Sequence, residues 1–236
     1  MSRPGIQSQW LKGFLDFVFP PLCLGCGEYT EADHSICDTC QKAIDLFEQP
    51  ICLTCGSMLA ADLRCPACRD DALVLYAYGN YTGPLEQIVI QFKFKGIMRP
   101  AGFFAEAIAS RFGELIKPAE GLVLVPVPLH PTRENRRGYN QAEILARRLS
   151  ETLGIPMRTD VLTRTKKRRP QARLNHRERA VNIRGVYEVA EVLDDSGSVL
   201  LVDDVVTSGA TVREASRTLQ TAGIDVGGVI SIAHAL

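Results

Sequence analysis

From residue 73 onward, short and nearly continuous apolar runs alternate with stretches whose apolar residues recur at helical spacing. The continuous runs predict strands, because buried strands of parallel sheets are hydrophobic on both faces. The predicted strands are residues 73–81, 121–129, 198–204 and 226–236. The stretches between them predict helices at residues 83–94, 100–116, 140–154 and 209–223, with a polar, arginine-rich loop before the third helix.

Two residues mark the ends of these predicted helices. Pro84 lies in the first turn of one helix, and Gly154 closes another. Strands that alternate with helices predict an α/β fold with a mostly parallel sheet and helices on both faces. In such sheets ligands bind beyond the carboxyl ends of the strands, so the loops that follow the strands are the candidate ligand site.

The N-terminal segment has a different pattern. Trp10, Phe14, Phe17 and Val18 follow helical spacing, which predicts an amphipathic helix within residues 1–20 that packs on the rest of the chain. A membrane or partner contact is the alternative. The segment lacks a secretory cleavage pattern, and no stretch of about 18 uncharged apolar residues exists. We therefore expect a cytoplasmic protein without a membrane span.

Composition adds a charge asymmetry that the net charge of zero conceals. Residues 130–185 hold 15 of the 27 Lys and Arg residues but only 5 of the 27 Asp and Glu residues. This local excess of positive charge predicts a surface for anions.

The cysteines form four C-x-x-C pairs within residues 23–68. They are Cys23/Cys26, Cys37/Cys40, Cys52/Cys55 and Cys65/Cys68. Each pair can fold as a tight knuckle, and two knuckles supply the four thiolates of a structural zinc site. Gly27 and Gly56 follow the first and third pairs, where the chain must turn. The pattern predicts a double zinc ribbon over residues 21–72 and a separate α/β domain over residues 73–236.

Three alternatives stay open for the cysteines. A disulfide framework or an iron–sulfur cluster would use the same residues, and His34 could replace one ligand. The pairs could also combine in sequence or interleave, since spacing alone does not decide between the two arrangements.

The stretch LLVDDVVTSGAT (200–211) joins a buried strand to a helix. Backbone N–H groups at a helix N-terminus, together with hydroxyl groups, form a cradle for phosphate. Asp203 and Asp204 lie where they can accept hydrogen bonds from neighbouring sugar hydroxyls, so the stretch predicts a ribose 5-phosphate site. A helix cap without a ligand is one alternative. A Walker B strand is another, but the chain has no G-x4-G-K-[ST] loop.

The stretch VLLVDDVVTSGAT (199–211) resembles the phosphoribosyl-pyrophosphate motif of type I phosphoribosyltransferases. The cysteine segment, "YTGPL" (81–85), "KFKG" (93–96) and "VPVPLHPTRENRRGYNQA" (125–142) extend the resemblance to the ComF family (ComFC-like or GntX-like proteins). The resemblance implies a type I phosphoribosyltransferase-like fold. It also implies that Asp203 and Asp204 hold the ribose. The residues that would hold the 5-phosphate are Thr207, Ser208, Gly209, Ala210 and Thr211.

The resemblance also implies a pyrophosphate site after the strand at 121–129. Arg137 with Gly138 is the preferred contact and Arg133 the next, because guanidinium groups suit phosphate oxygens. His130, Arg136 and the start of the next helix, Tyr139, Asn140 and Gln141, are further candidates, whereas solvated surface charge is the alternative. Magnesium would accompany the pyrophosphate.

Residues 163–187 are rich in charge and poor in core residues. The resemblance to type I enzymes implies that they form a hood loop over the sugar, and a plain solvated loop is the alternative. Gln171, Arg177 and Asn182 match recurrent polar positions of the family and are candidate ligand contacts. Lys166, Lys167, Arg168 and Arg169 are candidate contacts to a nucleic-acid backbone. Phe92 and Phe94 are predicted to belong to the core rather than to stack on bases.

Two functions of different kinds follow. One is an accessory protein of DNA uptake that binds phosphoribosyl pyrophosphate or a related sugar phosphate, and engages single-stranded DNA or DNA-uptake proteins. The other is an active, magnesium-dependent phosphoribosyltransferase that acts on a nitrogen nucleophile. The sequence assigns no catalytic residue.

Overall fold

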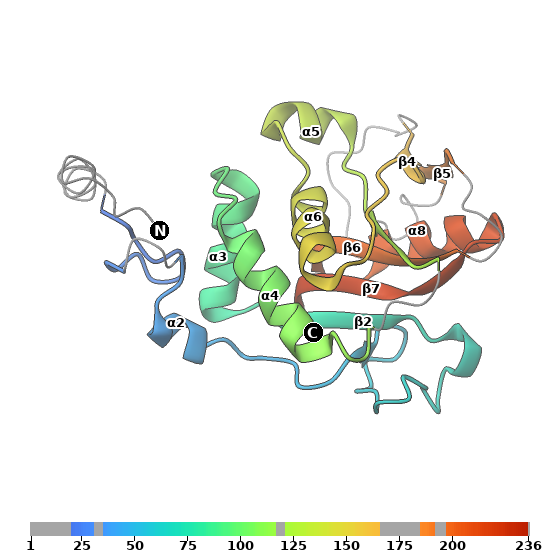
Figure 1. The fold of residues 1–236 in the computed structure, drawn as a ribbon, viewed down its shortest axis with the longest axis horizontal. Helices are drawn as coiled ribbons and strands as arrows, with labels where there is room; N and C mark the ends of the chain where they lie inside the picture. The colour runs from blue at the N-terminus through green and yellow to red at the C-terminus, as the bar shows by residue number, and fades with distance from the viewer. Residues whose placement is uncertain (1–19, 31–34, 117–120, 166–184, 192–196, 236) are drawn as a thin grey trace, which may run out of the picture.

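The structure is a computed structural model, and it describes residues 20–30, 35–116, 121–165, 185–191 and 197–235 (Figure 1). The predicted helix at residues 1–20 lies almost wholly outside this part, as does His34. Among the described residues, we find no helix that could span a membrane.

The described core is a five-stranded, mostly parallel sheet with the strand order β1-β2-β7-β6-β3. Its parallel strands are β2 (Val74–Asn80), β7 (Asp225–His234), β6 (Ser198–Val206) and β3 (Val123–Pro126). They confirm the four predicted strands. β3 is shorter than predicted and ends at Pro126, because Pro126 and Pro128 have no N–H to continue the ladder.

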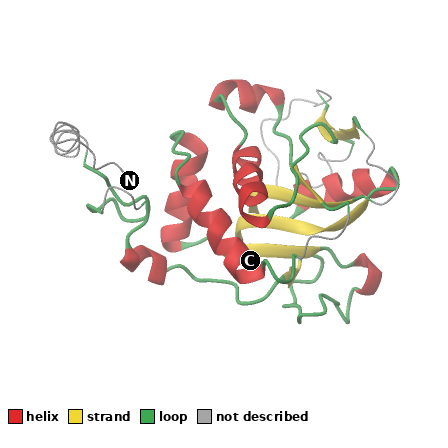
Figure 2. Cartoon of the chain, in the orientation of Figure 1, coloured by secondary structure: helices red, strands yellow, loops and turns green. Residues whose placement is uncertain are grey.

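Helices cover both faces of this sheet, as predicted (Figure 2). α3 (Gly83–Phe94), α4 (Pro100–Phe112) and α6 (Gln141–Leu153) pack on one face, and α8 (Ala210–Thr221) packs on the other. Alternate side chains of β6 point to opposite faces of the sheet and pack against the helices on each face. Leu200 and Val202 point toward α6, whereas Val199 and Leu201 belong to the core under α8.

Two helical predictions need correction. The helix predicted over 100–116 ends at Phe112. The arginine-rich segment predicted as a loop contains α5 (Pro131–Arg137), which has no buried residue and therefore no apolar periodicity to reveal it. Caps at its two ends stabilise α5. The His130 side chain accepts a hydrogen bond from Thr132 N at the start, and Gly138 ends the helix in the left-handed conformation at φ 78°.

The cysteine segment contains α2 (Asp38–Lys42), β1 (Ile51–Cys52) and the 3₁₀ helix η1 (Arg69–Asp71). The first half of the segment packs beside α3, where Cys23 and Cys40 join the core cluster of Leu85. The second half continues the sheet at its β2 edge, where β1 pairs antiparallel with β2. Both halves therefore contact the α/β core, and the domain limits at residues 20, 72 and 73 stay predictions.

A second, two-stranded sheet lies beyond the carboxyl end of β3. It consists of β4 (Leu162–Arg164) and β5 (Tyr187–Val189), which pair antiparallel with Arg164 opposite Tyr187. These strands form the stem of the predicted hood loop. Gln171, Arg177, Asn182 and the basic residues Lys166–Arg169 lie outside the described residues.

Candidate functional site

The eight cysteines form two separate tetrads. Within each tetrad the four Sγ atoms lie within 4.8 Å of one another; the tetrads are Cys23, Cys26, Cys37 and Cys40, and Cys52, Cys55, Cys65 and Cys68. The pairs therefore combine in sequence rather than interleaving. All eight are free thiols, which does not support the disulfide framework.

The geometry of both tetrads fits a structural zinc ion. Tetrahedral zinc with Zn–S bonds of about 2.3 Å separates its sulfurs by about 3.8 Å. The Sγ atoms of Cys26 and Cys37 are 3.9 Å apart, and those of Cys55 and Cys65 are 3.5 Å apart. The N–H groups of Gly25 and Cys37 donate to Cys23 Sγ at 3.4 and 3.3 Å, as outer-shell donors do for thiolate ligands. Each tetrad can thus hold one zinc ion with no open position for water.

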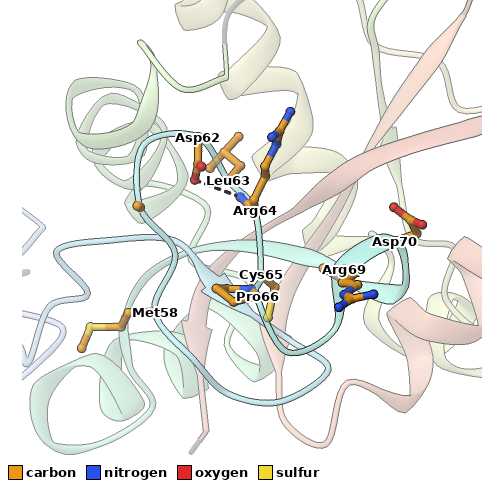
Figure 3. Close-up of a pocket in the computed structure, with 10 residues that line it drawn as sticks. Met58, Asp62, Leu63, Arg64, Cys65, Pro66, Arg69 and Asp70 are labelled. Atoms are coloured by element: carbon orange, nitrogen blue, oxygen red, sulfur yellow. Dashed lines mark hydrogen bonds between the residues drawn. The ribbon is translucent and has the colours of Figure 1, made fainter.

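The second ribbon also borders a cavity of about 820 Å³ (Figure 3). Apolar residues such as Met58, Leu63 and Pro66 line it together with Arg64 and Arg69. Leu63 and Arg69 have left-handed backbones, with φ of 58° and 49°. No pattern in the sequence predicts this cavity.

The predicted sugar-phosphate motif folds as a strand, a turn and a helix. Asp203 and Asp204 lie near the carboxyl end of β6, Thr207 and Ser208 form the exposed turn, and Gly209 caps α8 with φ 70°. Ala210 and Thr211 begin the helix. The left-handed conformation at Gly209 favours glycine. Its close packing is against the Leu53 side chain, where a Cβ at Gly209 would lie 3.0 Å from Leu53 Cδ2.

The two carboxyl groups share one cation, Lys93, which is not among the predicted site residues. Lys93 Nζ on α3 lies 3.0 Å from Asp204 Oδ1, and both side chains are largely buried. Burial raises the pKa of the Asp203 carboxyl to about 7; the Asp204 carboxylate adds to this rise and the Lys93 ammonium opposes it. Lys93 belongs to the quoted KFKG stretch, but only the fold brings α3 against β6.

The arginines predicted for pyrophosphate lie on α5. Arg133 is exposed, and Gly138 forms the turn that ends the helix. Arg137 instead donates to Gln141 Oε1 at 2.9 Å, and its guanidinium lies 4.9 Å from the centre of the Phe94 ring. A pyrophosphate contact by Arg137 or Arg133 stays a prediction.

Further hydrogen bonds tie α6 to the end of α3. Gln141 Nε2 donates to Lys93 O at 3.3 Å, and Tyr139 Oη donates to Phe92 O at 2.7 Å. Asn140 caps α6 by accepting from Ala142 N. Lys93 thus connects Asp204 to α6, through an ion pair with Asp204 and a hydrogen bond from Gln141.

The core prediction is correct for Phe92 and wrong for Phe94. Phe92 is fully buried, whereas Phe94 is 60% exposed. The difference arises because Phe94 is the last residue of α3 and lies past the edge of the core.

The hood stem carries two polar atoms without a hydrogen-bond partner in the described part of the chain. They are Tyr187 Oη and Arg164 Nε, and both are buried. The Arg164 guanidinium also lies 5.4 Å from the centre of the Tyr187 ring. Burial raises the pKa of Tyr187 to about 12, so its phenol keeps its proton and is available as a hydrogen-bond donor at neutral pH.

Comparison with known proteins agrees with this architecture. A double zinc ribbon model matches residues 14–69, and a phosphoribosyl transferase domain model matches residues 135–235. The chain is 33% identical over 217 residues to Competence protein F of Haemophilus influenzae, an alignment that covers 86% of this chain and 92% of that protein.

Two further relatives carry related names. DNA utilization protein YhgH of Salmonella typhimurium is 30% identical over 208 residues, covering 85% of this chain and 91% of the relative. Competence protein ComFC of Bacillus subtilis is 28% identical over 145 residues, covering 61% and 57% respectively. With its two cysteine tetrads and its phosphoribosyltransferase-like domain, the chain belongs to the ComF family of competence and DNA utilisation proteins.

Proposed function

We propose that the protein is a cytoplasmic component of DNA uptake that binds phosphoribosyl pyrophosphate, or a related ribose 5-phosphate, as its magnesium complex. The supporting observation is the arrangement of Asp203 and Asp204, paired with Lys93, directly before the turn that opens α8. The carboxylates accept hydrogen bonds from the ribose hydroxyls. The N–H groups at Gly209–Thr211, with the hydroxyls of the turn, hold the 5-phosphate.

The pyrophosphate end of the ligand is assigned to the positively charged groups around α5. Arg133, Arg137 and the Gly138 turn are its proposed contacts, together with the hood residues Gln171, Arg177 and Asn182. Arg137 must leave Gln141 and Phe94 to reach the ligand. When bound, Mg²⁺ neutralises the charge of the pyrophosphate oxygens.

Titration calorimetry with phosphoribosyl pyrophosphate and MgCl₂ tests the sugar site. The variants Asp203→Asn and Asp204→Asn should each weaken binding by about tenfold or more, because an amide is a poorer acceptor than a carboxylate for sugar hydroxyls. Asp225→Asn is the matched control. Asp225 is exposed at the start of β7, at the end of the sheet away from the proposed site, and accepts a hydrogen bond from Ser198 Oγ. Equal affinity of all three variants and the wild type would refute the sugar site.

Single-stranded DNA is the second proposed ligand, and exposed Phe94 supports it. The Arg137 guanidinium lies 4.9 Å from the centre of its ring, and Lys95 is its neighbour in the sequence. Single-strand binding sites combine stacking aromatics with positive charge. The cluster Lys166–Arg169 is proposed to extend this surface along the strand, and a DNA-uptake protein is the alternative partner.

A labelled single-stranded oligonucleotide tests this surface across a salt series. Phe94→Ala should weaken binding by about 1–3 kcal/mol. Tyr29→Ala is the matched control, because Tyr29 is an equally exposed aromatic on the first ribbon. Neutralising Lys166–Arg169 should flatten the dependence of log affinity on log salt; an unchanged slope would exclude that cluster.

Turnover is the alternative function, and the match of residues 135–235 to a phosphoribosyl transferase domain favours it. Incubation with phosphoribosyl pyrophosphate, MgCl₂ and a panel of nucleobases should release pyrophosphate if the protein is a phosphoribosyltransferase. Binding without release would restrict it to the accessory function.

A further inference from the structure

The second cysteine tetrad lies against the turn that opens α8. Leu53 is the second residue of the knuckle Cys52–Cys55 and is 6% exposed. Its Cδ atoms lie 3.0 and 3.1 Å from the position of a Cβ at Gly209. The backbone of Gly209 therefore packs closely on the Leu53 side chain, and a Cβ at this position would require Leu53 to shift.

The same leucine is also held by a polar contact. Arg213, in the first turn of α8, donates from Nη2 to Leu53 O at 2.7 Å. Arg213 N in turn donates to Gly209 O at 2.9 Å. Leu53 thus binds the start of α8 through its side chain and through its carbonyl group.

The position of Leu53 itself depends on the ribbon. Leu53 N donates to Leu73 O at 2.8 Å, and Cys52 N donates to Ser57 O at 2.8 Å. Because Cys52 and Cys55 are ligands of one tetrad, a zinc ion there fixes the backbone on both sides of Leu53.

We propose that the second zinc ribbon is a structural part of the sugar-phosphate site, with Leu53 and Arg213 as positioning residues that hold the Gly209 turn in its phosphate-binding conformation. The phosphate assignment rests on the proposed function, whereas the mechanical coupling does not. The first ribbon has no such role, since Leu24, at the same place in its own knuckle, packs in the core cluster beside α3.

This internal repeat supplies a matched control. Leu53→Ala and Leu24→Ala remove the same atoms from equivalent knuckles, at residues that are 6% and 7% exposed. The zinc-loaded full-length variants are compared by amide hydrogen exchange of residues 207–213 without ligand, by zinc content, and by calorimetry with ribose 5-phosphate.

We expect Leu53→Ala to retain two zinc ions, to accelerate exchange in the turn by about tenfold, and to weaken ribose 5-phosphate binding by a similar factor. Leu24→Ala should leave both turn exchange and binding unchanged. Leu53→Met, which restores the apolar volume, should recover wild-type exchange. Unchanged turn exchange in zinc-loaded Leu53→Ala would overturn the proposal.

Arg213→Ala keeps the experiment decisive if Leu53→Ala does not fold, because Arg213 lies outside the ribbon. It should also accelerate exchange at the turn, and unchanged exchange in this variant would equally overturn the proposal. Failure of the wild type to bind ribose 5-phosphate would instead refute the sugar-phosphate assignment, while the exchange rates would still decide the coupling.

Discussion

At the residue scale, Asp203 and Asp204 are neighbours in sequence with different surroundings. Asp204 has the Lys93 ammonium at 3.0 Å, whereas Asp203 is desolvated beside the Asp204 carboxylate. Asp203 therefore bears most of the unfavourable electrostatic free energy of placing two carboxyl groups at the end of a buried strand.

This difference predicts a pH dependence of stability. The pKa of Asp203 is raised to about 7 in the folded protein, so folding favours the protonated carboxyl and its contribution to stability decreases as pH rises toward and through 7. Asp203→Asn removes this titration. Its melting temperature relative to wild type should therefore increase by about 3–6 °C between pH 5.5 and pH 8, as measured by scanning calorimetry.

Asp225→Asn is the control for this experiment too, because it removes a carboxylate from the same pair of strands at the exposed end. A constant difference between Asp203→Asn and wild type over that range would show that Asp203 keeps an ordinary pKa in the folded protein.

At the element scale, α6 is fixed at its start by one residue. Asn140 Oδ1 accepts from Ala142 N at 3.0 Å, and Asn140 Nδ2 donates to Val127 O at 3.2 Å. The cap thus binds the helix to the loop that follows β3, and so positions α6 beside the proposed pyrophosphate site.

Replacement of this cap should destabilise the protein. Asn140→Ala loses both hydrogen bonds and should lower the free energy of unfolding by about 1–2 kcal/mol in urea titrations. Asn140→Asp keeps the acceptor but not the donor, so its loss should be smaller. Equal stability of Asn140→Ala and wild type would mean that the cap does not contribute.

At the scale of the whole molecule, the two tetrads pack on different parts of the α/β core. The first packs on the α3 layer, and the second continues the sheet through β1. Their metals should therefore be bound independently, although the cysteine pattern repeats.

Cys26→Ser and Cys55→Ser test this independence, because each replaces one exposed ligand of a different tetrad. We expect metal analysis to give about two zinc ions per chain in the wild type and about one in each variant. Loss of both ions from either variant would contradict independent sites and indicate that the ribbons fold as a single unit.

Features that depend on local pattern could be predicted from the amino-acid sequence. Apolar runs gave the four parallel strands, C-x-x-C spacing gave the ligands of both tetrads, and the acidic doublet with T-S-G-x-T located the candidate site. The apolar pattern did not predict α5, because this helix has no buried face and is instead stabilised by its caps at His130 and Gly138.

Contacts between distant segments could not be predicted in this way and are known from the fold alone. The pairing of Lys93 with Asp204, the exposure of Phe94, the sequential pairing of the knuckles and the contact of Leu53 with Gly209 all join residues from separate elements or depend on where an element ends. Periodicity describes which face of an element is buried, but it does not specify the partner that covers this face. The partner follows from the order of strands in the sheet, which is fixed by packing of the whole chain.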